Sequence, residues 1–522
     1  MKATSLRLLF LVSLVAFVAL MPFLSWVVFS EDDSHLMRVA SDYGWLQHYL
    51  VPEIYQQLSA ANYTPTALTF YKFLVSLCAF NSIAYLAFMT VMLALFTALA
   101  GRVTAIVTGR QQTALLAMLL IFSSLSMTTL LVRFYTMHYI VGGVFALSAL
   151  VLILPQRTTL RTAVSAGLLL WLALLSKEVY LVLPPMLMAL ALWRRDWPLL
   201  VSSALALGIY GFMRIYILGL SVDVGGESSY FAGFWNAGGE AIQRFLGWYV
   251  QTRWAILLAV LAALVLNPKR TLMLLPIAIA FVVPSLTVSH GITEFNLHGD
   301  RLYFAFDSAL AMVAAIALTE SRAADWLQSR NGYYAVAGLL VLVIALHLNA
   351  NRHHRDNLTE SVDYRITRFI LDNEDNLAGK TLFVPMNFIQ GDLMRINNII
   401  GRAPFHITQN CLQALQAADL VAFDGAANQI PREALAANCV AIEADVDAIV
   451  PPNYNHGVLS WQLQSSGDYN IGVLFVDRAF AVPIPAFSRQ LVRPRPGEQY
   501  QLFANSGNGW WFSDVRTLQI TP

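Results

Sequence analysis

The feature that most constrains this chain is a succession of long apolar segments between residues 8 and 350. A helix needs about 20 predominantly apolar residues to cross the hydrocarbon core of a bilayer. Only 12% of the residues are charged, against roughly 25% in soluble globular domains. We therefore expect an all-α polytopic membrane domain and exclude an ordinary soluble enzyme. The eleven segments expected to span are 8–29, 83–101, 113–132, 138–155, 162–176, 179–193, 198–218, 247–266, 271–289, 302–319 and 333–350.

The basic residues between these segments predict the orientation, because short cytoplasmic loops carry an excess of Lys and Arg. With a cytoplasmic N-terminus, each cytoplasmic piece has two basic residues, and an odd number of spans places residues 351–522 outside. The first apolar segment exceeds the 7–15 residues of a secretory signal core, so we expect it to be retained. The basic residues are Lys2, Arg7, Arg102, Arg110, Arg157, Arg161, Arg194, Arg195, Lys269, Arg270, Arg322 and Arg330.

The composition divides the chain into a membrane domain, 1–350, and an extracytoplasmic soluble domain, 351–522, in which charged residues are more frequent. We expect outer loops near 30–82 and 220–247, with residues 67–80 forming a helix at the outer interface. The soluble domain is predicted to be a small α/β domain whose C-terminal half is rich in β-strands.

Two pairs of residues in the soluble domain leave alternatives open. Cys411 and Cys439 are either two free thiols or a disulfide, and an oxidising compartment favours the disulfide. Trp510 and Trp511 either pack in the core or stack on the sugar rings of an acceptor.

Polar and ionisable residues gather at the predicted outer ends of the apolar segments. A transport pathway would need such groups near the bilayer midplane, so this distribution favours a reaction site at the outer surface. A net charge of +1 gives no indication of nucleic-acid binding. The clustered residues are Glu31, Asp32, Asp33, His35, Arg38, Arg133, Tyr135, His138, Lys177, Glu178, His298, Arg301 and Tyr303, and Glu294 and Asp300 lie beside them in sequence.

Each group of residues has a catalytic and a structural interpretation. Asp32 or Asp33 either removes a proton from a hydroxyl or caps a helix beginning near Ser34. Lys177 either binds a lipid phosphate or reaches the interface while paired with Glu178. Arg133 and Arg301 are either phosphate ligands or interfacial anchors.

Residues 1–320 resemble the GT-C superfamily of integral-membrane glycosyltransferases. The stretch Asp32-Asp33-Ser34-His35-Leu36 is similar to the Asp-Glu-x-His stretch of protein O-mannosyltransferases, with Asp33 in place of Glu. The Asp-Asp-x-x-x-x-Arg form that ends at Arg38, followed by Trp45, resembles bacterial and phage O-antigen-modifying glucosyltransferases. Further similarities are Arg133-Phe134-Tyr135, Ser176-Lys177-Glu178 before Pro184-Pro185, and Arg301-Leu302-Tyr303.

The resemblance implies inverting transfer of one sugar from a polyprenyl-phosphate donor to a glycan or lipid-linked acceptor at the outer face of a bacterial inner membrane. Asp32 or Asp33 would be the base, and Lys177, Arg301 and Arg133 would bind the donor phosphate. The other clustered residues, Glu31, His35, Arg38, Tyr135, His138, Glu178, His298 and Tyr303, would contact substrate. No cofactor is implied, and a divalent metal is not required because the cations neutralise the phosphate.

Two other functions stay open. One is a transporter or flippase for lipid-linked saccharides, which inverted repeats and polar breaks at the midplane would favour. The other is an O-antigen polymerase or ligase, which uses a diphosphate-linked donor.

Overall fold

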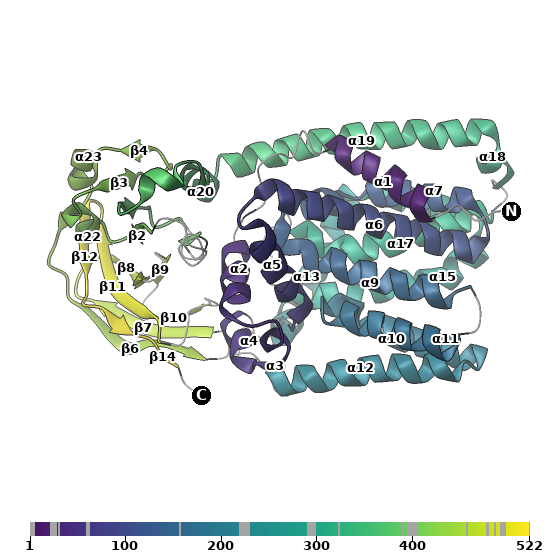
Figure 1. The fold of residues 1–522 in the computed structure, drawn as a ribbon, viewed down its shortest axis with the longest axis horizontal. Coiled ribbons are helices and arrows are strands. Elements are labelled where there is room, and N and C mark those ends of the chain that lie inside the picture. The colour runs from purple at the N-terminus through teal and green to yellow at the C-terminus, as the bar shows by residue number, and fades with distance from the viewer. Residues whose placement is uncertain are drawn as a thin grey trace. The chain divides into compact units, whose positions relative to one another are not determined.

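The computed structural model contains mostly helices in the first two thirds of the chain and strands in the last third (Figure 1). The described residues are 6–20, 29, 32–58, 63–155, 158–218, 230–289, 299–321, 324–388, 390, 391, 393, 404–455, 458–476, 480–484, 487–490 and 497–520. The chain divides into two compact units. Unit 1 comprises Met1–Val28, Asn62–Phe70 and Phe80–Asp356, and unit 2 comprises Phe29–Ala61, Tyr71–Ala79 and Asn357–Pro522. Unit 2 therefore includes most of the predicted first outer loop as well as the predicted soluble domain.

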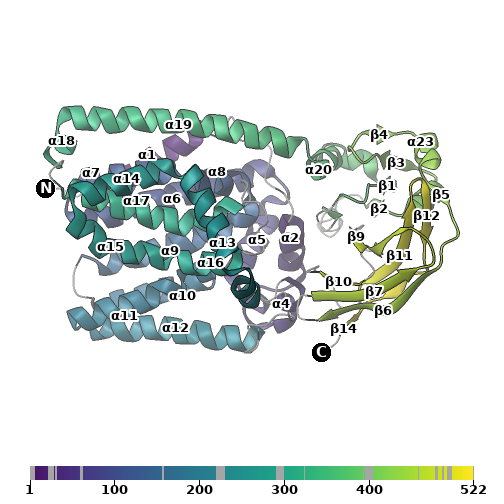
Figure 2. The same ribbon diagram turned by 180° about the vertical axis from the view of Figure 1, so that it is seen from behind.

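Unit 1 is a helical bundle in which helices distant in sequence lie side by side (Figures 1 and 2). Helix α6 contacts α1, α7, α9 and α17, while α10 packs between α9 and α12. The α-helices are α1 (Leu6–Leu20), α6 (Ser82–Thr108), α7 (Gln111–Phe122), α8 (Leu125–Val132), α9 (Met137–Ile153), α10 (Leu160–Leu174), α11 (Leu183–Arg194), α12 (Trp197–Leu218), α13 (Tyr230–Thr252), α14 (Trp254–Leu266), α15 (Pro268–Ala280), α16 (Val282–Ser289), α17 (Phe304–Thr319), α18 (Ala324–Gln328) and α19 (Arg330–Thr359).

Five helical segments of the described chain are long and apolar enough to cross a membrane. They are Ser82–Thr108, Phe134–Ile153, Trp197–Leu218, Pro268–Leu286 and Gly299–Thr319. The bent pairs α7 with α8 and Gly238–Thr252 with α14 raise the number to seven if each pair is one span. The other four predicted spans fall on α1, α10, α11 and α19, whose apolar parts are shorter. A polytopic helical protein is thus supported, while the number of eleven spans is not confirmed.

Unit 2 begins with the short helices that follow the first apolar segment. These are α2 (Asp32–Asp42), α3 (Gln47–Leu50) and α4 (Pro52–Leu58). A helix also forms where the sequence predicted one at 67–80, because α5 covers Pro65–Cys78 and enters unit 2 at Tyr71. The location of α5 at a membrane interface stays a prediction.

The next part of unit 2 is a small α/β layer. Its sheet has the order β2-β1-β3-β4, in which β1 is parallel to both neighbours and β4 is antiparallel to β3. The strands are β1 (Thr381–Phe383), β2 (His406–Thr408), β3 (Leu420–Phe423) and β4 (Gln429–Ile430), and the helices are α20 (Val362–Asp372), α22 (Cys411–Gln416) and α23 (Arg432–Ala437). A disulfide joins Cys411 on α22 to Cys439 after α23, with the two Cα atoms 6.1 Å apart.

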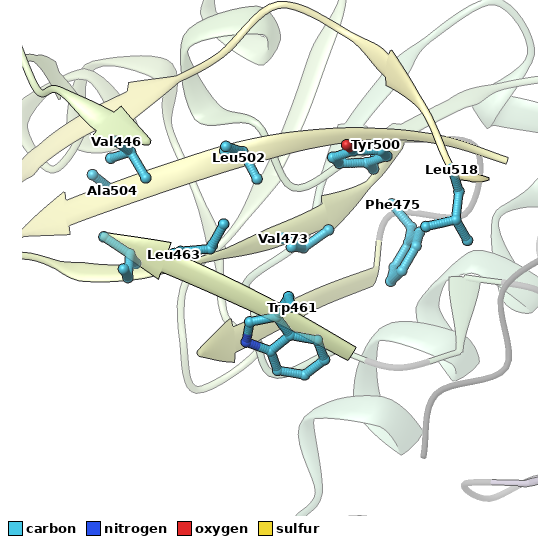
Figure 3. Close-up of a cluster of buried hydrophobic side chains, with 10 residues drawn as sticks. Val446, Trp461, Leu463, Val473, Phe475, Tyr500, Leu502, Ala504 and Leu518 are labelled. Carbon is cyan, nitrogen blue, oxygen red and sulfur yellow. The ribbon is translucent and has the colours of Figure 1, made fainter. Parts of the chain in front are cut away.

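The last part of unit 2 is a pair of β-sheets packed face to face. Alternate residues of β8 and β11, such as Val473 and Leu502, point into a core with Trp461 of β7, as period-two burial requires (Figure 3). One sheet has the order β10-β7-β6-β14, and the other β5-β12-β11-β8-β9, with β13 paired to β11. The strands are β5 (Val440–Ala441), β6 (Val446–Asn455), β7 (Val458–Ser465), β8 (Asn470–Phe475), β9 (Phe480–Ile484), β10 (Phe487–Gln490), β11 (Gln499–Ser506), β12 (Gly509–Phe512), β13 (Arg516–Thr517) and β14 (Gln519–Ile520).

The two tryptophans of β12 belong to this packing. Successive residues of a strand face opposite sides of the sheet. Trp511 packs against the core between the two sheets, whereas Trp510 stacks on Phe512 at 5.9 Å and contacts the cluster around the disulfide. Both residues therefore take part in packing within unit 2 from opposite faces of β12, and stacking of either ring on a sugar stays a prediction.

Candidate functional site

The acidic pair lies in the first turn of α2, which begins at Asp32. Carboxylates are stabilised there by the positive end of the helix dipole. Asp33 is fully buried and accepts a hydrogen bond from the Tyr71 hydroxyl at 2.7 Å, while Asp32 is half-buried. Burial and the tyrosine give Asp33 a fixed position, and Asp32 is the more accessible carboxylate. Glu31 lies outside the described residues.

His35 and Arg38 form a pair one turn further along α2. An Arg38 Nη2 atom lies 3.0 Å from His35 Nδ1, and both side chains are buried. A guanidinium can only donate, so Nδ1 must accept and the imidazole is neutral. This pair therefore contributes one positive charge and no proton donor at Nδ1.

Lys72 on α5 holds the C-terminal end of α2. Its ammonium group donates to the carbonyl oxygens of Ala40, Ser41 and Tyr43 at 3.2, 3.4 and 2.5 Å. These are the carbonyls that a helix end leaves without intrahelical partners, and a cation there also matches the negative end of the dipole. Burial lowers the pKa of Lys72 from its usual value, and the nearby Asp42 carboxylate opposes that shift.

His48 is a second buried group beside this helix end. Its Nε2 atom lies 3.3 Å from the Ala40 carbonyl, so Nε2 carries the proton that is donated. Burial, with a smaller contribution from the Lys72 charge, lowers the pKa of His48 to about 4 against the opposing effect of the Ala40 bond. His48 is therefore neutral at pH 7.

In unit 1, two of the predicted phosphate ligands meet at one tyrosine. Arg133 lies with its guanidinium 5.9 Å from the centre of the Tyr135 ring, and Arg301 approaches the same ring at 5.4 Å. Both arginines also reach the Tyr135 hydroxyl, at 3.5 and 3.4 Å. Residues 168 positions apart in sequence are thus brought to one side chain.

Lys177 extends this cluster. Its ammonium group lies 5.3 Å from the centre of the Tyr139 ring and 3.8 Å from the Glu178 carboxylate. The His138 ring packs against Tyr139 at 4.7 Å and is within electrostatic reach of both Lys177 and Arg301. We call Arg133, Tyr135, His138, Tyr139, Lys177, Glu178 and Arg301 the cation cluster, in which three positive charges accompany one carboxylate.

Glu178 also has a structural contact. One of its oxygens accepts the main-chain N–H of Tyr63 at 2.8 Å, and the Leu175 carbonyl accepts the N–H of Thr66 at 3.2 Å. These two bonds fix the start of α5 to the connection between α10 and α11. Glu178 thus anchors a segment of the chain in addition to pairing with Lys177.

Three tight turns bring the cluster together. The 3₁₀ turns are η2 (Phe134–Thr136), η3 (Glu178–Val182) and η5 (Gly299–Tyr303), and each leads directly into a helix, α9, α11 or α17. Arg133 and Lys177 have extended backbone conformations immediately before η2 and η3, and Arg301 lies within η5. A 3₁₀ turn changes the chain direction in few residues, so side chains at three helix starts can converge.

An apolar cavity of about 300 Å³ lies in the bundle beside η3. Tyr180 of that turn lines it, and the Tyr180 hydroxyl donates to the Tyr139 carbonyl of the cation cluster. Gly142 and Gly143 make room for this tyrosine, because an added Cβ would lie 2.5 Å from a Tyr180 or a Phe96 ring carbon. The other lining residues come mainly from α6, α9, α11, α15 and α17 and include Val103, Leu147, Leu187, Ile277, Phe281 and Met312.

A buried ionic network was missed by the sequence analysis. Arg253, between α13 and α14, donates to Asp300 Oδ1 at 2.6 Å and to Asp307 Oδ2 at 3.4 Å, and all three side chains are at most 1% exposed. The Ser126 hydroxyl belongs to this network. It accepts a hydrogen bond from the Arg253 guanidinium and donates one to the Asp307 carboxylate at 2.6 Å. The sequence did contain an indication of the network, because Arg253 and Asp307 are ionisable residues inside predicted spans, where such residues are rare and usually paired.

Tyr303 belongs to this network. Its fully buried ring lies 4.5 Å from the Arg253 guanidinium, and its hydroxyl donates to the Phe245 carbonyl at 2.9 Å. These contacts account for Tyr303 by packing rather than by substrate binding. His298 lies outside the described residues.

The chain was compared with protein-family models and with curated proteins. No protein-family model matches the chain, and no curated protein matches it. Within the described ranges there is no group of three or more His, Cys, Asp or Glu side chains arranged to hold a metal ion.

Proposed function

We propose that this protein is a membrane glycosyltransferase that moves one sugar from a polyprenyl-phosphate donor to an acceptor hydroxyl at the outer face of a bacterial inner membrane. The observation that carries the proposal is the cation cluster, in which three turns bring Arg133, Lys177 and Arg301 around Tyr135 and Tyr139. The cluster suits a phosphate because its arginines and lysine offer several charge-assisted donors. The resemblance to the GT-C superfamily assigns three of these residues the same role.

The proposed reaction explains why cations are needed at this position. The acceptor oxygen attacks the anomeric carbon as its proton passes to a carboxylate base, and the bond from that carbon to the phosphate oxygen breaks. The donor is a phosphodiester with one negative charge, and the leaving polyprenyl phosphate gains a second. Cations already in place stabilise this developing charge, which is where electrostatic catalysis is most effective.

The apolar cavity supports a lipid-linked donor rather than a nucleotide sugar. It adjoins the cation cluster through Tyr180, whose hydroxyl is bonded to the Tyr139 carbonyl. A polyprenyl phosphate is apolar along its chain and anionic at one end, and these two parts match the cavity and the cluster. Burial of an isoprenoid segment there would be favoured by roughly 25 cal/mol per Å² of apolar surface.

Asp32 is the better base of the acidic pair. Asp33 is fully buried and already accepts the Tyr71 hydroxyl, so its oxygens are committed to holding α2. Asp32, in the same turn, is half-buried and can exchange protons with a substrate. We therefore propose that Asp32 receives the acceptor proton and that Asp33 fixes the turn.

The test is transfer of a radiolabelled sugar from polyprenyl-phosphate donors to endogenous glycan in membrane vesicles. Wild type is compared with Asp32→Asn and Asp33→Asn after equal expression and folding are established. We expect transfer by wild type, loss by about 100-fold or more in Asp32→Asn, and a smaller loss in Asp33→Asn. Absence of transfer by wild type from every donor tried would contradict the proposal, and undiminished transfer in Asp32→Asn would remove that carboxylate from the mechanism.

A further inference from the structure

The 3₁₀ turn η5 is held at three of its five residues, Asp300, Leu302 and Tyr303. The Asp300 side chain accepts from Arg253 at 2.6 Å and from the Trp248 indole N–H at 2.8 Å. Its main-chain carbonyl lies 3.0 Å from the Ser126 hydroxyl, whose single proton is shared between this carbonyl and Asp307. The Leu302 carbonyl accepts from Ser285 at 2.7 Å. Together with the contacts of Tyr303 described above, these bonds fix the backbone on both sides of Arg301.

Arg253 is the centre of this arrangement. It contacts Asp300 and Tyr303 on the turn, Asp307 on the first turns of α17, and Ser126 on α8. A guanidinium presents five donors in a rigid plane, so one side chain can fix several elements at once. The geometry of η5 therefore depends on a residue that lies 47 positions before Asp300 in sequence.

Arg301 lies between the two residues that Arg253 holds. Its side chain leaves the turn toward the cation cluster and reaches the ring and hydroxyl of Tyr135. A displacement of η5 would move the Arg301 guanidinium away from Tyr135 and Arg133. Misplacement of a catalytic group by about 1 Å can cost roughly 100-fold in rate.

We propose that Arg253 is a positioning residue that sets the place of Arg301 in the cation cluster. The inference rests on the proposed function only in naming the donor phosphate as the ligand of Arg301. Arg253 itself is buried between carboxylates and acts through the turn. The hold on the turn can be measured without any donor, so failure of the proposed function and failure of this inference are distinguishable.

The first measurement is a cross-link between positions 301 and 135. Arg301→Cys and Tyr135→Cys are combined in a Cys78→Ser background, because Cys78 is the free cysteine outside the disulfide. A short bis-methanethiosulfonate reagent is applied in membrane vesicles with and without Arg253→Lys. We expect Arg253→Lys to lower the yield, because an ammonium cannot span the partners of the planar guanidinium.

Two further variants keep this measurement decisive. Ser126→Ala removes the hydroxyl that contacts Arg253, Asp307 and the Asp300 carbonyl while leaving the ion pairs, so it tests the hold on the turn if Arg253→Lys fails to fold. Arg270→Lys is the matched control, because Arg270 pairs with Glu320 at 2.7 Å at the other end of α17. We expect Ser126→Ala to lower the yield and Arg270→Lys to leave it unchanged. Unchanged yield in both Arg253→Lys and Ser126→Ala would overturn the inference.

The second measurement is the KM for a polyprenyl-phosphate sugar. We expect Arg253→Lys to raise this KM by about tenfold or more, the effect of weakening one charge-assisted contact. In an Arg301→Met background the same substitution should change KM by less than about twofold, because coupled residues are not additive. An equal rise in both backgrounds would show that Arg253 acts independently of Arg301 and would overturn the inference.

Discussion

Arg253 contacts the turn η5 and Arg301 lies within it, but the two arginines differ in what surrounds them. Arg253 is fully buried and bonded to two carboxylates, Asp300 and Asp307. Arg301 is half-buried and lies over Tyr135 beside two further cations, Arg133 and Lys177. An ion pair inside the bundle fixes structure, whereas cations gathered around aromatic rings form a positively charged cluster of the kind that suits an anion.

The difference explains how one short segment can be both rigid and reactive. Residues 300, 302 and 303 are held by Arg253, Ser285 and Phe245, while residue 301 extends to the cation cluster. Ground-state rigidity is useful in electrostatic catalysis because donors that are already oriented need no reorganisation during the reaction. Four predictions test this difference between the cation sites.

The largest expected effect is on stability. Arg253→Met leaves Asp300 and Asp307 buried without their cation and should lower the free energy of unfolding by about 3–5 kcal/mol. Arg301→Met should cost less than about 1 kcal/mol, because cation–π contacts at partly exposed sites are weak. Thermal unfolding in detergent micelles measures both. Equal losses would show that the two arginines do not differ as described.

The next effect is on donor binding. Lys177→Met and Arg301→Met should each weaken binding of a polyprenyl phosphate by roughly tenfold to a hundredfold, the cost of a charge-assisted hydrogen bond. Arg270→Met, which breaks the Arg270–Glu320 pair elsewhere in unit 1, should leave affinity unchanged. Intrinsic tryptophan fluorescence titration in nanodiscs gives the three affinities. A loss of the same size in Arg270→Met would attribute the effect to general destabilisation.

A third type of cation site lies in unit 2. Lys72 bonds main-chain carbonyls at the end of α2, so Lys72→Met should locally destabilise that helix by up to about 2 kcal/mol. Hydrogen exchange of the amides of residues 32–42 should accelerate, whereas exchange in the sheets of residues 440–520 should not change. Unchanged exchange in α2 would show that Lys72 has no capping role.

The smallest effect concerns a buried group that stays neutral. Because the pKa of His48 is lowered to about 4 in the folded protein, the unfolded chain binds more protons between its ordinary pKa near 6.5 and pH 4. The contribution of His48 to stability is therefore present above pH 6.5 and is lost as the pH falls through 4. Relative to His48→Gln, wild type should lose protection of residues 32–58 in this interval. Parallel pH profiles for the two proteins would contradict the neutral assignment.

Sequence patterns predicted the parts of this molecule that depend on composition and local spacing. Each predicted span overlaps at least one described helix, with 113–132 and 247–266 each falling on a bent pair, and the C-terminal half of the soluble domain is rich in strands as expected. The cations at 133, 177 and 301 could be selected because each follows or opens an apolar segment. Their convergence depends on three turns that meet only in the folded bundle.

The rest depended on contacts between distant residues. Arg253 lies inside a predicted span, but its two carboxylate partners are 47 and 54 positions away, so the network that they form could not be predicted. Likewise, period-two alternation places Trp510 and Trp511 on opposite faces of β12. The apolar cluster that each ring contacts is formed by residues distant in sequence, so it could not be predicted.

The most direct test of the central claim is photo-labelling of the donor site. A polyprenyl phosphate with a diazirine beside the phosphate is irradiated in vesicles containing wild type, Arg301→Met or the control Arg270→Met, and the labelled peptides are sequenced. The account predicts labels in residues 133–139 and 177–182 of wild type and Arg270→Met, with a clear loss in Arg301→Met. Labels confined to other helices, or equal labelling of these peptides in all three proteins, would contradict the cation cluster as the phosphate site.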